Sequence, residues 1–334
     1  MRGGFYEIKE MAAALVNIAG GTTFTEAARR AQVGYWGTRG TGRLGPKTTE
    51  NGQTVADWLN QFGPVISEAH AEAGWPETVI LDSTEFKWTD KNGKSSQLFV
   101  ILAAWGYEAG ASKGRLWRVE ARPTDKSMDW QKFLRSLPGK PRSVVYDGDR
   151  SIGPAVKRVW RGSVPVHICE HHLTVNAGKA LAADGQSHGT LRTLLSTAFH
   201  SLPEWEAFRD AVRKDGRCPE TTQWVDYKDA ALSLQTANRA NIPAHYSTGP
   251  LDAALATIRQ SVARRRWTFR NKERMDQLLD LMRLRINRLD NVEDWAECIR
   301  QHLEQNDGVP VRSRKIADPV TFDQQGERVY SLRK

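Results

Sequence analysis

The order of apolar and polar residues divides the chain into a helical start, a central stretch of strands and a helical remainder. Up to about residue 75 the spacing is that of helices. Residues 20–30 resemble the first half of a helix-turn-helix, capped by Thr23 or Thr25, but the glycine-rich segment 34–45 makes a poor second helix. A small helical region that only packs is the alternative. A helix is also expected over 54–73, where apolar side chains recur at Val55, Leu59, Phe62 and Ile66.

The centre of the chain carries the signals of strands separated by helices. Apolar or alternating runs predict five strands, at residues 78–82, 98–105, 115–121, 143–147 and 164–169. Residues 91–94 form a predicted hairpin turn, and helices are expected at 128–137 and 152–159. The order β-β-β-α-β-α-β is that of a ribonuclease H-like fold, a mixed five-stranded sheet in which three meandering strands precede two parallel ones.

After residue 169 the pattern is helical nearly to the end of the chain. Successive helices are expected at 173–183, 191–199, 205–212, 224–235, 251–262, 275–286 and 295–303. The helix at 251–262 follows Gly249-Pro250, and proline in a first turn is a common start signal. The fold class is therefore α/β, with flanking helices and a helical N-terminal region.

Composition and charge narrow the class of protein. The chain has 334 residues, of which 40% are hydrophobic and 26% charged, which is typical of a folded globular protein. No apolar run approaches the ~20 residues that cross a bilayer. The start has no secretory segment, and three cysteines cannot build a disulfide framework. We expect a cytoplasmic protein, drawn weakly to a polyanion by its net charge of +9.

Basic side chains cluster in two stretches. Residues 27–49 hold five basic residues and no acid, and residues 252–290 hold ten basic residues against five acidic ones. A solvated surface explains either cluster alone, but several clusters together favour a nucleic-acid partner. Arginine beside tryptophan also permits phosphate contact together with stacking on an unpaired base. The expected nucleic-acid contacts are Arg29, Arg30, Arg39, Arg43, Lys47, Arg264, Arg265, Arg266, Trp267 and Arg270.

Two carboxylates follow apolar residues at the ends of predicted strands. Asp82 and Asp147 would lie at one edge of the sheet, where α/β proteins gather their ligands. Neighbouring carboxylates repel unless a cation lies between them, and Mg²⁺ prefers oxygen ligands. Two such ions can act on a phosphodiester. Asp252, in the first turn of its helix, is the expected third ligand, although each acid alone can equally be a cap or turn residue.

The segments around these acids resemble the core of Mutator-like DDE transposases of bacterial insertion sequences. The matching segments are 81–86, 144–152 and 169–173, together with 247–252 and 266–271, and the resemblance spans about residues 79–287. The chain departs from the family at Asp252, where glutamate is usual, so the metal geometry must adjust or the site is weakened. Glu204 and Glu220 are poorer candidates for the third acid.

The resemblance implies a ribonuclease H-like catalytic core interrupted by an all-helical insertion. It divides the chain into a helical DNA-binding region (1–75), the first part of the core (76–170), the insertion (171–246), the last core helices (247–290) and a C-terminal helix with a basic tail (291–334). It also implies that Cys169, His172 and Asp149 order the pocket or flank the DNA. Cys169 and His172 have the spacing of half a zinc site, a weaker interpretation with only Cys218 and His245 as partners.

The implied activity is metal-dependent DNA cleavage and strand transfer at the ends of an insertion sequence. Asp82, Asp147 and Asp252 would hold two Mg²⁺ or Mn²⁺ ions while water frees a 3′-hydroxyl that then attacks target DNA. Expected partners are double-stranded DNA, at transposon ends and target, and a second copy of the chain in a homodimer near a bacterial nucleoid. The alternatives are a DNA-binding protein on a transposase scaffold with weakened or lost catalysis, and a ribonuclease H-like nuclease.

Overall fold

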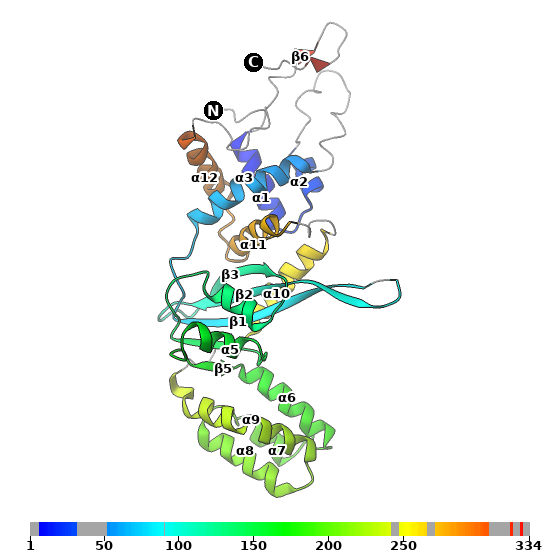
Figure 1. Ribbon diagram of the computed structural model, residues 1–334, viewed down its shortest axis with the longest axis vertical. Helices are drawn as coiled ribbons and strands as arrows, with labels where there is room; N and C mark the ends of the chain where they lie inside the picture. The colour runs from blue at the N-terminus through cyan, green and yellow to red at the C-terminus, as the bar shows by residue number, and fades with distance from the viewer. Residues whose placement is uncertain are drawn as a thin grey trace. The chain divides into compact units, whose positions relative to one another are not determined.

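The computed structural model describes residues 7–31, 52–89, 91–241, 247–265 and 271–306, and the backbone of a short antiparallel pair, β6 (Thr321–Phe322) and β7 (Arg328–Val329) (Figure 1). The chain forms two compact units. The first unit comprises residues 1–72, 115–121 and 254–334, and the second unit comprises residues 73–114 and 122–253. This division differs from the expected one, because the N-terminal helices share a unit with the C-terminal helices.

The first unit is built on amphipathic helices. They are α1 (Ile8–Ala19), α2 (Phe24–Arg30), α3 (Gln53–Ala69), most of α10 (Gly249–Ala263), α11 (Lys272–Ile286) and α12 (Val292–Gln305). The expected cap of α2 is confirmed, since Thr23 Oγ1 accepts a hydrogen bond from the Glu26 backbone N–H at 3.2 Å. α3 packs on α11, and α1 packs on both α11 and α12, with Leu15, Leu59 and Trp295 fully buried. Burial of these apolar faces explains why residues 1–72 do not form a unit alone.

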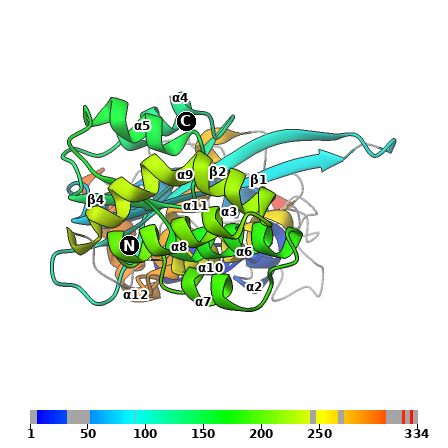
Figure 2. The same ribbon diagram turned by 90° about the horizontal axis from the view of Figure 1, so that it is seen from below.

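A mixed five-stranded sheet carries the candidate site. Its strands are β1 (Thr78–Thr89), β2 (Ser95–Tyr107), β3 (Arg115–Arg122), β4 (Ser143–Tyr146) and β5 (Val166–Ile168). Their order is β3-β2-β1-β4-β5, and β1 pairs antiparallel with β2 but parallel with β4, as β4 does with β5. Helices α4 (Ser127–Leu134) and α5 (Ile152–Val159) supply the crossovers and pack side by side (Figure 2). The expected mixed sheet with flanking helices is confirmed.

Strand β1 is longer than the sequence predicts. We expected it to end at Asp82, but it continues to Thr89 in a long hairpin with β2 (Figures 1 and 2). Only the part from Thr78 to Leu81 pairs with β4; it is buried and, after Thr78, apolar, and this is the part that the apolar pattern detects. In the hairpin Phe86 stacks on Phe99 with ring centroids 4.6 Å apart. Asp82 therefore lies inside a strand, at the point where its parallel pairing ends.

Four helices of the second unit lie within residues 171–246, the range of the predicted insertion, with the first beginning at Glu170, and we refer to them as the insertion. They are α6 (Glu170–Ala183), α7 (Thr190–Leu195), α8 (Leu202–Asp215) and α9 (Pro219–Ala237). They enclose a core of their own that includes Leu181, Leu195, Trp205 and Phe208. The side-chain amide of Gln235 on α9 connects the insertion to the sheet. It accepts a hydrogen bond from the Ile168 N–H at 2.8 Å and donates one to the Ile168 carbonyl at 2.9 Å. This side chain continues the hydrogen bonding of β5 into the insertion.

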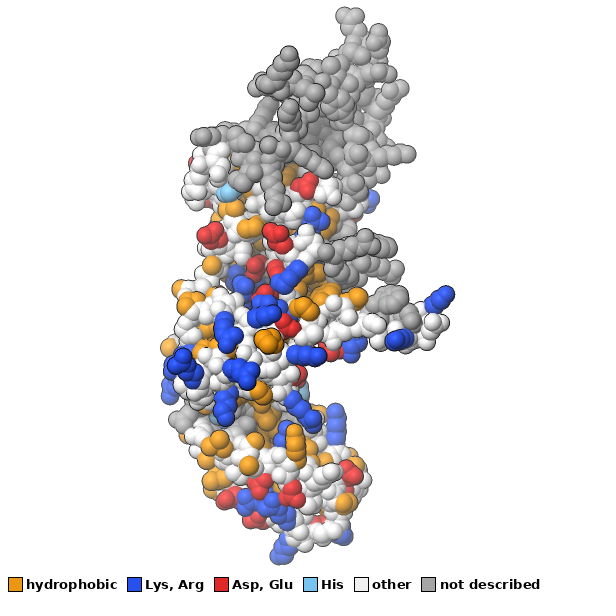
Figure 3. Space-filling view, in the orientation of Figure 1, with side chains coloured by type: hydrophobic (Ala, Val, Ile, Leu, Met, Phe, Trp, Pro, Cys, Tyr) orange, Lys and Arg blue, Asp and Glu red, His pale blue; other side chains and the backbone are white. Residues whose placement is uncertain are grey.

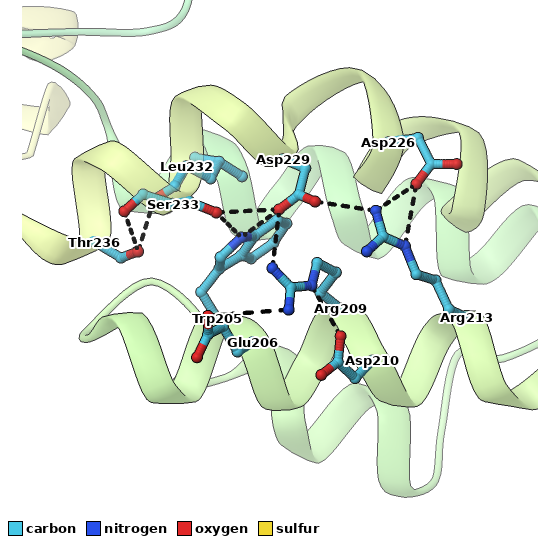
Figure 4. A network of polar contacts seen from close by, with 10 residues as sticks. All are labelled: Trp205, Glu206, Arg209, Asp210, Arg213, Asp226, Asp229, Leu232, Ser233 and Thr236. Atoms are coloured by element: carbon cyan, nitrogen blue, oxygen red, sulfur yellow. Dashed lines mark hydrogen bonds and ion pairs between the residues drawn. The ribbon is translucent and has the colours of Figure 1, made fainter.

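Asp229 is the centre of a polar network between α8 and α9 (Figure 4). Its Oδ1 accepts from the Trp205 indole N–H at 3.1 Å and from Ser233 Oγ at 3.1 Å, while its Oδ2 accepts from Arg213 at 3.0 Å. Burial opposes ionisation, yet these hydrogen bonds hold the pKa of Asp229 below its ordinary value. The carboxylate therefore stabilises the insertion at pH values above the ordinary pKa of an aspartate. This stabilisation is lost as the pH falls through the lowered pKa of the folded state.

Replacing Asp229 by Ala is expected to lower the free energy of unfolding at pH 7 by about 1–3 kcal/mol, because a buried indole N–H loses an acceptor. Urea unfolding followed by tryptophan fluorescence measures the effect. Asp210→Ala is the control, since Asp210 forms only an exposed ion pair with Arg209 and should contribute under about 1 kcal/mol. Equal losses in the two variants would contradict the structural role of Asp229.

Candidate active site

The structure brings the three expected carboxylates together. Leu81 of β1 lies opposite Tyr146 of the parallel strand β4, so the next residues, Asp82 and Asp147, are neighbours on one face of the sheet. Asp252 lies in the first turn of α10, and its side chain shares a hydrogen bond with that of Asp82. All three belong to the second unit. Acids that are 65 and 105 residues apart in sequence thus meet where the β1–β4 pairing ends.

Backbone N–H groups hold two of these carboxylates in place. Asp82 Oδ1 accepts from the Ser83 N–H at 2.7 Å, and Asp147 Oδ1 accepts from the Asp149 N–H at 2.9 Å. Asp149 in turn accepts from the Ser151 N–H, which fixes the loop between β4 and α5. Asp149 therefore shapes the loop that carries Asp147. Gly148 makes the turn with φ of +99°, a conformation that glycine adopts readily.

Charge accumulates at this point of the sheet. Burial, the hydrogen bond from Asp252 and the charges of Asp147 and Asp252 raise the pKa of Asp82 to about 8, against the opposing effect of the Ser83 N–H. Asp82 therefore holds a proton at neutral pH in metal-free protein, with the side chain of Asp252 as its hydrogen-bond partner. A cation can take the place of that proton. The donor set consists of carboxylate oxygens, which suits a hard ion such as Mg²⁺ or Mn²⁺.

In this arrangement the side chains of Asp82 and Asp252 bond to each other, and Asp147 bonds to the Asp149 N–H. Within the described ranges no group of three or more His, Cys, Asp or Glu side chains is spaced as the ligands of a metal ion are. The fit to a metal therefore rests on the chemistry of the donors and on the raised pKa of Asp82.

In metal-free protein, the free energy of unfolding is expected to fall as the pH rises from about 4 to about 8. The raised pKa of Asp82 means that the folded state holds a proton that the unfolded state releases. The stabilisation is fully present below the ordinary pKa of 3.8 and is lost as the pH passes about 8. Its size is on the order of a few kcal/mol. Thermal unfolding in EDTA at pH 5, 7 and 8.5 measures it.

The difference between wild type and Asp82→Asn isolates this titration from all others. The variant should be the more stable protein at pH 8.5 and should lose that advantage at pH 5, whereas Asp125→Asn, outside the site, should follow wild type. Mg²⁺ should stabilise wild type at pH 8.5 more than it stabilises the variant, because the ion replaces the proton. Parallel pH profiles for wild type and Asp82→Asn would disprove the assignment.

A buried threonine joins the third acid to the Cys169–His172 element. Thr248, only 1% exposed, donates from Oγ1 to Asp252 Oδ2 at 3.2 Å. The same hydroxyl lies 3.2 Å from His172 Nδ1 and 3.7 Å from Cys169 Sγ. Cys169 and His172 therefore lie against the hydroxyl that bonds to Asp252, a position compatible with the expected role of ordering the pocket. Thr248 was missed from sequence, and its only signal is a position four residues before Asp252 at the helix start.

The zinc interpretation gains no support. Cys169 and His172 both lie against the Thr248 hydroxyl. Cys218 is buried in the insertion, where its Sγ lies 3.8 Å from Asp215 Oδ1. His245 lies outside the described residues.

The alternative third acids have other roles. Glu204 accepts from Ser201 Oγ at 2.7 Å and completes the cap of α8. Glu220 lies in the first turn of α9, where the backbone N–H of that residue is bonded to Asp184. Asp252 is thus the acid that the fold places beside Asp82.

An exposed tyrosine of the insertion lies beside the loop of the second acid. Tyr227 on α9 is 64% exposed, and the guanidinium of Arg150 lies 5.9 Å from its ring centroid. Lys228 Nζ lies 5.0 Å from the same centroid. A ring between two cations is suited to stacking on a base next to a phosphate. Nothing in the sequence marks this pair, because Arg150 and Tyr227 are far apart along the chain.

One expected nucleic-acid contact is wrong. Arg265 is 4% exposed and donates from Nη2 to the carbonyl oxygens of Ile18 and Thr22 within the first unit. Burial lowers its pKa to about 10. Arg265 therefore packs against the turn between α1 and α2, and its guanidinium does not reach solvent. A run of three arginines cannot show which member faces inward.

The remaining basic candidates divide into two groups. Arg29 and Arg30 are exposed on α2, and both pair with Glu26, while Arg264 is exposed at the end of α10. The others lie outside the described residues; they are Arg39, Arg43, Lys47, Arg266, Trp267 and Arg270.

None of the helices among the described residues is both long and apolar enough to cross a membrane. Comparison with protein-family models and with curated proteins gives no match to this chain, so the argument for its function rests on the residues and geometry of the site.

Proposed function

We propose that this protein is a metal-dependent DNA transposase of the DDE type. The observation that carries the proposal is the meeting of Asp82, Asp147 and Asp252, with the pKa of Asp82 displaced to about 8. Perturbed carboxylates at the ends of parallel strands are typical of catalytic sites. The strand order β3-β2-β1-β4-β5 is compatible with a ribonuclease H-like core, and the helices α6–α9 correspond to the insertion of such an enzyme.

Mg²⁺ or Mn²⁺, held by Asp82, Asp147 and Asp252, would supply positive charge to the attacking and leaving oxygens at a phosphodiester. The chain's own groups prepare for this. Asp82 would lose its proton when a cation binds, while the N–H groups of Ser83 and Asp149 keep two carboxylates oriented and Thr248 orients the third. Hydrolysis frees a 3′-hydroxyl, and its attack on a second duplex is another in-line displacement, so one set of acids serves both steps.

The shorter third acid does not by itself imply lost catalysis. Asp252 already contacts Asp82 across the site, so the start of α10 lies close enough to the sheet for an aspartate to reach. A scaffold without catalysis would have no need to keep three acids together at the cost of their mutual repulsion. The geometry therefore favours the active enzyme over the DNA-binding scaffold.

The test uses the full chain, Mg²⁺ and a duplex that carries the inverted repeat flanking the coding region. We expect strand cleavage that leaves a 3′-hydroxyl, and joining of a pre-cleaved end to plasmid DNA. Cleavage without joining would identify a nuclease, and binding without either reaction would identify a DNA-binding scaffold. A protein that neither binds nor cuts the duplex would overturn the proposal.

A further inference from the structure

The two crossover helices and the segments next to them carry a basic surface that the sequence analysis did not single out. Residues 126–161 contain nine lysines and arginines, and every one is exposed: Lys126, Lys132, Arg135, Lys140, Arg142, Arg150, Lys157, Arg158 and Arg161. The same stretch has three acids. Asp129 is buried and bonded to Thr124, while Asp147 and Asp149 belong to the site. We call this surface the α4–α5 face.

The fold turns these charges outward. Trp130 and Phe133 of α4, and Ala155 and Val156 of α5, are buried, so the basic side chains of both helices remain on the solvent side. Figure 3 shows lysine and arginine side chains gathered over the part of the molecule where Figure 1 draws α5. Because α4 and α5 pack side by side, their charges make one surface.

Most of these charges have no acidic partner among the described residues. Arg142 pairs with Glu77 at 3.1 Å, and Lys140 donates to Ser163 at 3.2 Å. Within the described ranges no carboxylate lies at ion-pair distance from Lys126, Lys132, Arg135, Lys157, Arg158 or Arg161. Unpaired like charges on one face repel each other, so a polyanion that neutralises them binds favourably.

We propose that the α4–α5 face binds the phosphate backbone of a DNA duplex whose sequence it does not read. The stretch contains no asparagine, its one glutamine, Gln131, is buried, and it exposes no aromatic ring, so it lacks the exposed amides that pair with adenine and the rings that stack on bases. A lipid surface fits less well, because Met128 is the one large apolar side chain exposed in this stretch.

The α4–α5 face is continuous with the candidate active site. Arg150 belongs both to the face and to the loop that carries Asp147 and Asp149. A duplex along the face would therefore pass beside the carboxylates. This inference rests on the proposed function for its choice of duplex: an enzyme that joins a specific end to unrelated DNA must also hold DNA of arbitrary sequence, either the donor flank or the target.

The test measures binding of the full chain to a fluorescein-labelled duplex of about 30 random base pairs, by anisotropy between 50 and 200 mM NaCl. The variant replaces Arg135, Lys157 and Arg158 by Gln. Its matched control replaces Lys179, Arg192 and Lys214, three exposed basic residues of the insertion, by Gln. We expect the first triple variant to lose about tenfold or more in affinity and its salt slope to shrink by about 0.9 for each lost phosphate contact, and the control to lose little.

Circular dichroism checks that both triple variants are folded. Equal affinity and equal salt slope for wild type and the α4–α5 variant would overturn the proposal, whether or not the enzyme cleaves DNA. If the α4–α5 variant loses duplex binding but the wild-type protein cuts no DNA, the α4–α5 face is supported as a DNA-binding surface and the proposed function is excluded. In an active enzyme, weakened cleavage of a flanked end identifies the flank as the occupant, and weakened joining of a pre-cleaved end identifies the target.

Discussion

Replacing Asp82 or Asp147 by Asn is expected to reduce Mg²⁺-dependent DNA cleavage by at least about a thousandfold, because ligation of a catalytic metal contributes several kcal/mol to the transition state. Asn keeps the size of the side chain and its hydrogen bond from the neighbouring backbone N–H, but it removes the charge that attracts the cation. Binding of a duplex should change by less than about twofold, since the proposed phosphate contacts come from basic side chains that both variants keep. Cleavage of a labelled end duplex measures the first effect and anisotropy the second.

The control for this prediction is Asp125→Asn, which removes a carboxylate outside the site and should leave cleavage unchanged. Unfolding cannot explain the expected loss, because Asp82→Asn should raise stability at neutral pH in metal-free protein. If both Asn variants cut DNA at the wild-type rate, the carboxylates would not hold the catalytic metal.

The strands and helices of the second unit follow closely from the sequence. Buried strands such as β4 are nearly continuous apolar runs, and such runs can be recognised from the sequence alone. The outer part of β1 could not be predicted, because beyond Asp82 the strand is stabilised by pairing with β2 alone and its residues are mixed in polarity. The sequence pattern also could not predict which helices make up the first unit, since this depends on which apolar helix faces pack against one another.

The three acids were easier to predict from the sequence than the residues that contact or surround them. Asp82 and Asp147 each follow an apolar run, and the parallel register of β1 and β4 then makes them neighbours. Asp252 was predicted from its place in the first turn of a helix, and the resemblance to a known family added to that prediction, because a first-turn acid is usually a capping residue. Thr248 and Tyr227 act through contacts with residues distant in sequence, and the exposure of the α4–α5 face and the burial of Arg265 depend on tertiary packing.

Replacing Asp252 by Ala is expected to silence cleavage, with a loss comparable to that of the Asp82 variant, because the site then lacks its third oxygen donor. Asp252→Glu should retain a measurable part of the activity. Its carboxylate keeps the charge but is one methylene longer, so it can meet Asp82 or Thr248 only after a shift of the side chain. Rates of strand cleavage in Mg²⁺ and in Mn²⁺ measure both variants, and the more adaptable Mn²⁺ should favour Asp252→Glu.

A second measurement separates a metal ligand from a residue that only packs. In metal-free protein Asp252→Ala removes both a hydrogen bond and a charge that raise the pKa of Asp82, so the fall in stability between pH 5 and pH 8.5 should become smaller. The Mg²⁺-induced rise in melting temperature should shrink in the same variant, whereas Asp252→Glu should keep part of it. Wild-type cleavage and wild-type Mg²⁺ stabilisation in Asp252→Ala would exclude Asp252 as a ligand. The metal site would then consist of Asp82 and Asp147 with a different third donor.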